Sequence, residues 1–317
     1  MPLDPQVARY LQAAAATDTA GSVSPSLAEL RRASVQGVLA EAGEPESVAA
    51  VEDRLLDGPG GVLPVRIYTP VLAGPGPLPA LIYFHAGGWI MGSIEGHDPV
   101  CRALANHAGC LVVAVEYRLA PEHPFPAAPE DCYAATRWVA EHAEALTVDP
   151  ARIAVGGDSS GGNLAAAVAL IARDRGGPKL CYQVIIYGET DYYEPGTASY
   201  RTYAEGYDLT RASMMRFWDH YLTNPAERIH PYAAPLRAAD LSGLPPALII
   251  TAEYDPTRDE TEDYARRLQE AGVPTHLSRY DGMIHGFFRM FAVFERSHQA
   301  LAEIAESLRA AFARGAK

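Results

Sequence analysis

Features that would direct a chain to a membrane or to nucleic acid are absent from this sequence. No apolar run approaches the roughly 20 residues that cross a bilayer, and the most apolar helical stretch, residues 164–172, is far too short. The N-terminus has no basic segment followed by an apolar one, so no signal peptide is expected. The formal net charge of −13 argues against nucleic acid or an anionic membrane as a partner.

Cysteine is scarce and irregularly placed. The four cysteines form no CxxC pair or other regular spacing, so we expect no metal site, and nothing else in the sequence indicates a cofactor. They are most simply interpreted as small buried hydrophobic side chains in a reducing compartment, which favours the cytoplasm. They are Cys101, Cys110, Cys132 and Cys181.

What is present is the composition of an ordinary globular protein, with 48% hydrophobic and 21% charged residues among 317. A chain of this length can bury one large core, so residues 1–317 are expected to form a single domain. From about residue 48, strand-like and helical segments alternate, which predicts an α/β fold with a mostly parallel sheet between layers of helices. Strands are expected near residues 52–56, 62–68, 80–84, 111–115, 153–155, 183–187, 247–252 and 275–280, and helices near 99–107 (capped by Asp98), 130–143, 163–172, 259–271 and 291–313.

Two segments fall outside this alternation. Helices are expected at residues 5–16 and about 25–40, because Asp4-Pro5 and Ser24-Pro25 are capping residues followed by proline. The stretch after Tyr187 is much longer than an ordinary connection and is rich in aromatic residues, with a helix expected near 211–221. Both segments, about 1–45 and about 190–240, are candidates for a cap over an active site. A surface excursion with its own small core is the alternative for the second.

The most informative stretch joins a short apolar strand to a helix through Gly157-Asp158-Ser159-Ser160-Gly161-Gly162. Strand, glycine-flanked serine and helix are typical of a nucleophile elbow, in which a sharp turn projects the serine hydroxyl and only glycine avoids collisions two residues away. A plain Gly/Ser turn or a phosphate-binding loop is the alternative. The phosphate loop requires GxxxxGK[ST] or GxGxxG, and neither spacing is present.

A serine hydroxyl is a weak nucleophile, so it needs a base, and the base needs an orienting acid. In enzymes with such an elbow the acid follows the serine in the chain and a histidine comes last. Asp255 and His285 each follow an expected strand, so both would meet Ser159 at the carboxyl edge of the sheet. Glu253 and Asp259 are alternatives for the acid. The histidines at positions 142, 276 and 298 fall within expected helices or a strand.

The reaction also needs N–H donors where negative charge develops, an oxyanion hole. His85-Ala86-Gly87-Gly88-Trp89 directly follows an expected strand, and its glycines let the backbone approach a substrate oxygen. Gly87 and Gly88 are the expected donors, together with the N–H of Ser160; a plain tight turn is the alternative. Trp89 suggests an apolar substrate pocket, although aromatic residues also form a cap's own core.

Together these motifs resemble the hormone-sensitive-lipase-like family of α/β-hydrolases, the bacterial family IV esterases. Residues 85–89 resemble that family's HGGG region, and residues 116–122 (Glu-Tyr-Arg-Leu-Ala-Pro-Glu) resemble the run after its next strand. Residues 157–162, 255–260 and 285–287 resemble its elbow, acid loop and base loop, so the likeness extends from about residue 45 onward. The resemblance implies an α/β-hydrolase fold and a serine carboxylesterase for short- to medium-chain esters. Its partner would be a small-molecule ester, and a homodimer is implied because family members often dimerise.

Two positions depart from the family pattern. Ala86 stands where the family usually has the first glycine of HGGG, and its methyl group would restrict the loop and the acceptance of bulky substrates. Ser160 stands where alanine is usual, and its N–H is unchanged. A non-catalytic binding protein on the same fold is one functional alternative, against which the presence of His285 argues. An amidase or acyltransferase with the same triad is another, and only substrate assays separate it.

Overall fold

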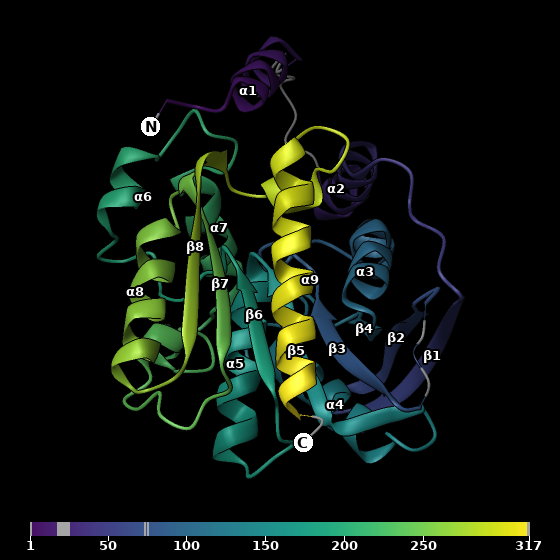
Figure 1. Ribbon diagram of the computed structural model, residues 1–317. Helices are drawn as coiled ribbons and strands as arrows, with labels where there is room; N and C mark the ends of the chain where they lie inside the picture. The colour runs from purple at the N-terminus through teal and green to yellow at the C-terminus, as the bar shows by residue number, and fades with distance from the viewer. Residues whose placement is uncertain (1, 18–25, 73, 75, 316–317) are drawn as a thin grey trace.

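The computed structural model describes residues 2–17, 26–72, 74 and 76–315, and these contain one eight-stranded sheet (Figure 1). The strand order is β1-β2-β4-β3-β5-β6-β7-β8. The first two strands are antiparallel to each other, β2 is antiparallel to β4, and all later pairs are parallel, as predicted. The strands are β1 (Ala50–Gly58), β2 (Gly61–Thr69), β3 (Leu78–Phe84), β4 (Leu111–Val115), β5 (Val148–Asp158), β6 (Tyr182–Ile186), β7 (Ala247–Tyr254) and β8 (Thr275–Ile284).

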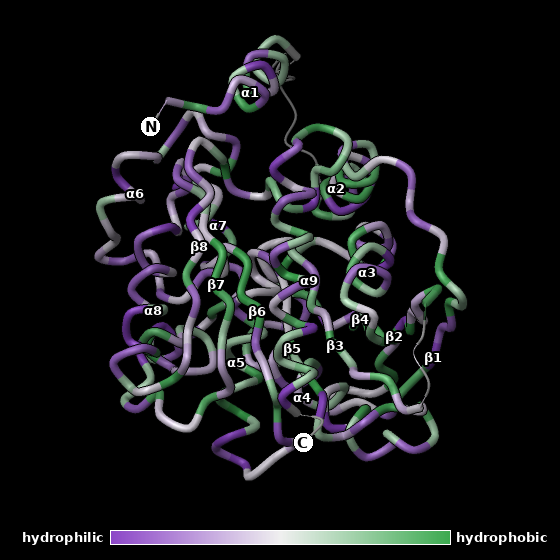
Figure 2. The backbone as a smooth tube through the Cα atoms, in the orientation of Figure 1, coloured by the Kyte–Doolittle hydropathy of each residue, from purple (hydrophilic) through white to green (hydrophobic). Residues whose placement is uncertain are grey.

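Helices cover both faces of this sheet because its central strands alternate apolar side chains between two cores. Leu81 and Tyr83 belong to the core under α3 (Ile94–Ala108) and α9 (Glu295–Gly315). Ile82 and Phe84 belong to the opposite core, under α4 (Ala127–Glu141) and α5 (Ser160–Asp174), and α8 (Arg258–Glu270) extends that layer over β7. Figure 2 shows β6 and β7 as mostly hydrophobic and α8 as mostly hydrophilic, as expected for buried strands beside a surface helix.

Helix α3 begins earlier than the predicted residue 99. Its N-cap is Ser93, whose Oγ accepts the N–H of Gly96 at 3.2 Å, so Pro99 lies inside the helix. The predicted cap, Asp98, instead accepts a hydrogen bond from Arg102 Nε at 2.6 Å. The first turn is also held from outside, because Glu116 Oε2 accepts the Ile94 N–H at 2.7 Å. An Asp-Pro pair therefore marked the second turn of the helix and not its start.

The remaining helices gather near the carboxyl ends of the parallel strands (Figure 1). Helix α1 (Pro5–Thr17) is linked to β8, since Asp4 N–H donates to the Gly282 carbonyl at 3.1 Å. Helix α2 (Leu27–Ala42) begins at the N-cap Ser26 with a Glu29 capping box, whereas the predicted Ser24-Pro25 cap lies outside the described residues. The segment between β6 and β7 carries α6 (Ala198–Thr202), α7 (Arg211–Tyr221), η1 (Pro225–Ile229) and η2 (Pro235–Arg237).

Most aromatic residues of this segment do not form a separate small core. They join the large core cluster that also contains side chains of β3, β4 and β5. The segment is therefore anchored on the body of the domain. The fully or nearly fully buried members are Tyr192, Tyr193, Tyr200, Trp218 and Tyr221.

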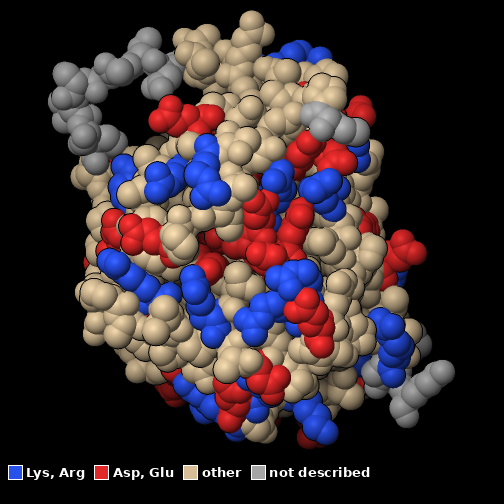
Figure 3. Space-filling view, turned by 90° about the vertical axis from the view of Figure 1, so that its left-hand side faces the viewer, with Lys and Arg blue, Asp and Glu red and all other residues tan. Residues whose placement is uncertain are grey.

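The surface is mixed in charge. Figure 3 shows acidic and basic side chains interspersed over the side of the molecule that carries α8 and β8. Within the described ranges, no helix combines the length and the apolar character needed to cross a membrane.

Candidate active site

Ser159 occupies the turn between β5 and α5 with φ 55° and ψ −126°, a conformation that side chains rarely adopt. Its N–H donates to the Ile186 carbonyl of β6 at 2.9 Å, which holds the turn against the sheet. A Cβ atom at Gly161 would collide with the carbonyl oxygen of Phe84, and one at Gly157 would collide with the carbonyl oxygen of Gly161. The backbone thus allows only glycine at these two positions, which is the constraint that the motif predicted.

His285 and Asp255 meet Ser159 at the carboxyl edge of the sheet. His285 Nε2 lies 2.9 Å from Ser159 Oγ, and His285 Nδ1 lies 2.7 Å from Asp255 Oδ2. The other oxygen of Asp255 accepts hydrogen bonds from Thr257 N–H at 2.8 Å and Thr257 Oγ1 at 2.9 Å, so Oδ2 is left for the imidazole. Burial alone would lower the pKa of His285, but the charge and hydrogen bond of Asp255, together with the nearby Glu189 and Asp158, outweigh burial and the pKa is raised.

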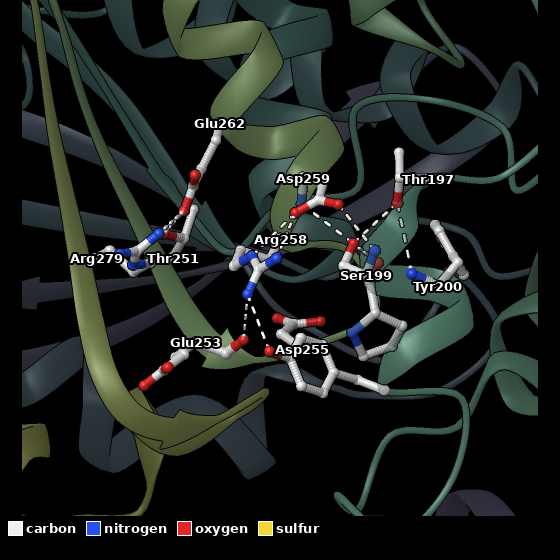
Figure 4. Close-up of polar contacts among 12 residues, drawn as sticks. Thr197, Ser199, Tyr200, Thr251, Glu253, Asp255, Arg258, Asp259, Glu262 and Arg279 are labelled. Atoms are coloured by element: carbon white, nitrogen blue, oxygen red, sulfur yellow. Dashed lines mark hydrogen bonds and ion pairs between the residues drawn. The ribbon is translucent and has the colours of Figure 1, made fainter. Parts of the chain in front are cut away.

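The two alternative acids are engaged elsewhere, as Figure 4 shows for Asp259. Asp259 Oδ1 accepts hydrogen bonds from Arg258, and its Oδ2 accepts the N–H of Ser199 at 2.8 Å. Glu253 Oε2 accepts the N–H of Gly282 at 2.7 Å. Only Asp255 is shown in contact with the histidine, so geometry favours it as the orienting acid.

The glycine loop after β3 lies beside the nucleophile. Gly87 has φ 134° and Gly88 has φ 58°, and the Gly87 carbonyl accepts hydrogen bonds from Ile90 and Met91. Both glycines line the same cavity as Ser159. Ser160 is the first residue of α5, so its N–H has no acceptor within the helix. The structure therefore brings the three predicted N–H groups to the neighbourhood of Ser159.

A cavity of about 220 Å³ opens over Ser159 and His285. Its lining includes Ala86, Gly87 and Gly88 of the glycine loop, together with residues of α3 and residues that follow β8. Helix α2, and α7 with the residues before it, also line the cavity. The lining residues from these two segments are Ser34, Val35, Val38, Asp208, Leu209, Ser213 and Phe217.

Trp89 does not line this cavity, which differs from the prediction that it contacts substrate. Its side chain is fully buried, with ring centroids 4.4 Å from both Trp218 and Tyr221, and it is stacked on the latter. The ring packs against α7, whose Trp218 and Tyr221 provide an apolar site for it. Trp89 therefore joins the glycine loop to α7.

The family description of the α/β-hydrolase fold matches residues 81–289. The chain is 39% identical to an ethyl acetate hydrolase of Pseudomonas putida, over 97% of this chain and 99% of that protein. It is also 39% identical to an arylesterase of Saccharolobus solfataricus, over 90% of this chain and 92% of that one. A hyperthermophilic esterase of the archaeon Pyrobaculum calidifontis has a similar structure, with a TM-score of 0.90 and 43% identity over 98% of this chain and 99% of that chain.

The chain belongs to the α/β-hydrolase family. The predicted fold class and the resemblance to hormone-sensitive-lipase-like esterases are confirmed. In this α/β-hydrolase, the run at residues 116–122 supports the glycine loop: the Tyr117 ring stacks on His85 at 4.1 Å, and its hydroxyl donates to the His85 carbonyl at 2.8 Å. Burial lowers the pKa of His85 to about 3, so that ring is neutral at ordinary pH.

Two further residues of the site were missed by sequence reasoning. His97 on α3 accepts the N–H of Ala86 through Nε2 at 3.2 Å and thus fixes the glycine loop. Glu189, in the loop after β6, places Oε1 2.9 Å from Ser159 Oγ. A histidine inside a helix and an acid inside a loop carry no sequence signal of such roles, because only the fold brings them to the nucleophile.

The described part of the chain contains no group of three or more His, Cys, Asp or Glu side chains placed to hold a metal ion. The four cysteines are free thiols, and Cys101, Cys110 and Cys132 are buried.

Proposed function

We propose that Ser159, His285 and Asp255 are the catalytic triad of this serine carboxylesterase. The observation that carries the proposal is the continuous chain of contacts from Ser159 Oγ through both nitrogens of His285 to Asp255. Each member comes from the end of a different strand, and rigid elements hold all three. The esterase names of relatives that align over nearly the whole chain support ester hydrolysis as the reaction.

In the proposed mechanism Ser159 Oγ attacks the ester carbonyl carbon while its proton passes to His285 Nε2. Asp255 holds the ring and stabilises the imidazolium. The N–H groups of Gly87, Gly88 and Ser160 stabilise the oxyanion, and loss of one such donor typically costs roughly 3 kcal/mol of transition-state stabilisation. His285 then protonates the departing alcohol, and a water molecule, deprotonated by His285, cleaves the acyl-enzyme.

The cavity favours short- to medium-chain esters as substrates. Its volume of about 220 Å³ lies below the roughly 300–1,000 Å³ typical of pockets that bury drug-sized ligands. We include in this proposal a cap formed by residues of about 1–45 and about 190–240 around one domain of residues 1–317. Its support is that α2 and α7 both line the cavity. Ala86 also lines the cavity, and its methyl group would narrow the site for bulky substrates.

Three sequence-based expectations remain predictions. A homodimer was implied only by the resemblance. A cytoplasmic location is supported by the free thiols, which suit a reducing compartment. The relatives' names support an ester as the substrate in place of an amide, and water as the acyl acceptor. Substrate assays test both expectations.

Replacement of Ser159 by alanine tests the nucleophile. We expect Ser159→Ala to lose nearly all turnover of p-nitrophenyl butyrate, a decrease of kcat by roughly 10⁶-fold, and to lose labelling by a fluorophosphonate probe. Ser278→Ala is the matched control, since Ser278 lies on β8 and bonds Glu303 at 3.0 Å. Near-normal turnover by Ser159→Ala would overturn the assignment.

A further inference from the structure

The carboxyl group of Glu189 contacts the nucleophile without lining the cavity. Its Oε1 is 2.9 Å from Ser159 Oγ, the residue has no exposed surface, and it does not line the substrate cavity. Its backbone is held in place as well, because Asn163 Nδ2 donates to the Glu189 carbonyl at 2.6 Å. Glu189 is therefore a rigidly placed acid that touches a reacting atom without touching substrate.

The count of protons around Ser159 Oγ determines what this acid can do. The hydroxyl has a single proton, yet Oγ has two hydrogen-bond neighbours, His285 Nε2 at 2.9 Å and Glu189 Oε1 at 2.9 Å. When His285 Nδ1 donates to Asp255, a neutral ring offers only a lone pair at Nε2. The serine then donates to His285, and its contact with Glu189 is a hydrogen bond only if Glu189 carries a proton.

The ionised form of Glu189 supports a different arrangement. A carboxylate only accepts hydrogen bonds, so the serine proton turns toward Glu189. His285 then keeps its contact with Oγ only by carrying a proton on Nε2, and an imidazolium cannot act as the base. Oγ–H directed to His285 is the productive arrangement and Oγ–H directed to Glu189 is not.

We propose that Glu189 is a fourth catalytic group, which as a neutral acid donates a hydrogen bond to Ser159 Oγ and thereby directs the hydroxyl proton to His285. The serine proton passes to His285 and leaves with the alcohol, and Glu189 keeps its own proton. In deacylation Oγ departs from the acyl carbon, and the Glu189 O–H stabilises the negative charge that develops on it. His285 then returns to Oγ the proton that it took from water.

The surroundings favour the neutral form of this carboxyl group. Oε2 has no hydrogen-bond partner, and in the described part of the chain no lysine or arginine forms an ion pair with Glu189. A buried carboxylate that has no cation beside it and one oxygen without a hydrogen bond is costly. Burial accordingly raises the pKa of Glu189 to about 7, and the nearby Asp255 also raises it, against the opposing effects of His285 and of hydrogen bonds from the Glu189 backbone N–H and Ser159. The titratable groups around Glu189 are His285 after β8, Asp255 after β7, Glu260 on α8, Tyr200 on α6 and Asp191 on its own segment.

The proposal predicts that kcat falls at alkaline pH because Glu189 loses its proton. As the pH rises through the pKa of Glu189, the carboxylate competes with His285 for the serine proton, so kcat falls. Glu189→Gln presents an amide N–H to Oγ at every pH and removes this decline. Its kcat is expected to match that of the natural enzyme within about twofold at pH 6 and to exceed it by about tenfold at pH 9. A tenfold difference is the size expected when the hydrogen bond from Ser159 to His285 is displaced.

A second variant separates the hydrogen bond from the charge. Glu189→Leu has a similar size but no donor, so we expect kcat to fall by about tenfold at pH 6 while KM stays unchanged, because residue 189 does not line the cavity. Glu260→Gln is the matched control, a buried acid beside Glu189 that bonds Thr190 N–H at 3.1 Å instead of the serine. It is expected to keep the natural pH profile.

The experiment measures kcat and KM for p-nitrophenyl acetate from pH 5.5 to 9.5, with absorbance corrected for p-nitrophenol ionisation. The proposal is supported if kcat of the natural enzyme declines at alkaline pH and kcat of Glu189→Gln does not. Parallel profiles for the two would overturn it, even if Glu189→Leu fails to fold. A Glu189→Leu variant that folds and keeps full kcat would also overturn it.

Discussion

The proposed acid of the triad, Asp255, differs from the nearby acids Glu253 and Asp259 in the hydrogen-bond partners of its carboxylate. Asp259 is bound to Arg258 and to the Ser199 N–H, and Glu253 is bound to the Gly282 N–H. Asp255 has one oxygen held by Thr257 and the other turned to His285. Chain order and the strand end favoured Asp255 and left Glu253 and Asp259 as alternatives, whereas the hydrogen bonds distinguish the three acids.

Asparagine substitutions test this difference between the acids. Asp255→Asn is expected to lower kcat by roughly 10³–10⁴-fold, because an amide does not hold the imidazole in the tautomer that accepts the serine proton. Asp259→Asn keeps the size of the side chain and is expected to retain kcat. Steady-state kinetics on p-nitrophenyl butyrate measures both, and an equal loss in the two variants would contradict the assignment.

At the scale of elements, the proposed oxyanion loop, residues 85–89, is held by packing against three neighbouring parts of the fold. Trp89 is held by Trp218 and Tyr221, His85 is stacked on Tyr117 after β4, and Ala86 is bonded to α3 through His97. The loop itself is rich in glycine and would be mobile alone. Its geometry is therefore a property of the surrounding elements.

Removal of the Trp89 ring should disturb both stability and catalysis. Trp89→Leu leaves a cavity beside α7, and we expect a loss of about 2–4 kcal/mol in the free energy of unfolding. We also expect kcat to fall by about tenfold, because the N–H donors of Gly87 and Gly88 would shift. A loss of that size corresponds to about one hydrogen bond. Trp138→Leu, on the partly exposed side of α4, is the control, with about 1 kcal/mol or less lost. Urea unfolding and kcat test this, and an unchanged kcat in a destabilised Trp89→Leu would show that the ring only fills space.

At the scale of the whole molecule, buried acids make stability depend on pH. Glu260 is 1% exposed, and burial, with the neighbouring Asp191 and Glu189, raises its pKa well above the ordinary value of 4.5. The folded state thus binds this proton more tightly than the unfolded state. The stabilisation is fully present below about pH 4.5 and is lost as the pH rises through the folded-state pKa.

Glu260→Gln isolates this contribution. The amide oxygen still accepts the Thr190 N–H but has no charge at any pH, so the variant should become progressively more stable than the natural protein as the pH rises from 4.5. The difference should grow by at most about 1.4 kcal/mol per pH unit. Urea unfolding at several pH values measures it, with Glu270→Gln on the exposed end of α8 as control. A difference that does not vary with pH would contradict this account.

The sequence predicted the sheet and the meeting of the triad because both follow from short-range patterns. Apolar runs mark buried strands, and parallel strands end at one edge, so Ser159, Asp255 and His285 had to converge. The start of α3, the direction of Trp89 and the contact of Glu189 with Ser159 depend on tertiary packing. The ring of Trp89 packs on Trp218 and Tyr221 of α7, more than 120 residues away along the chain, so no local pattern places it.

The separation of Ser159 and His285 along the chain, 126 residues, has a consequence for synthesis on the ribosome. At about 5–20 residues per second, the base is added roughly 6–25 s after the nucleophile. During that interval the nascent polypeptide carries a serine with no partner to activate it. Esterase activity therefore begins only after the final strand has been translated, and the unfinished protein cannot attack cellular esters.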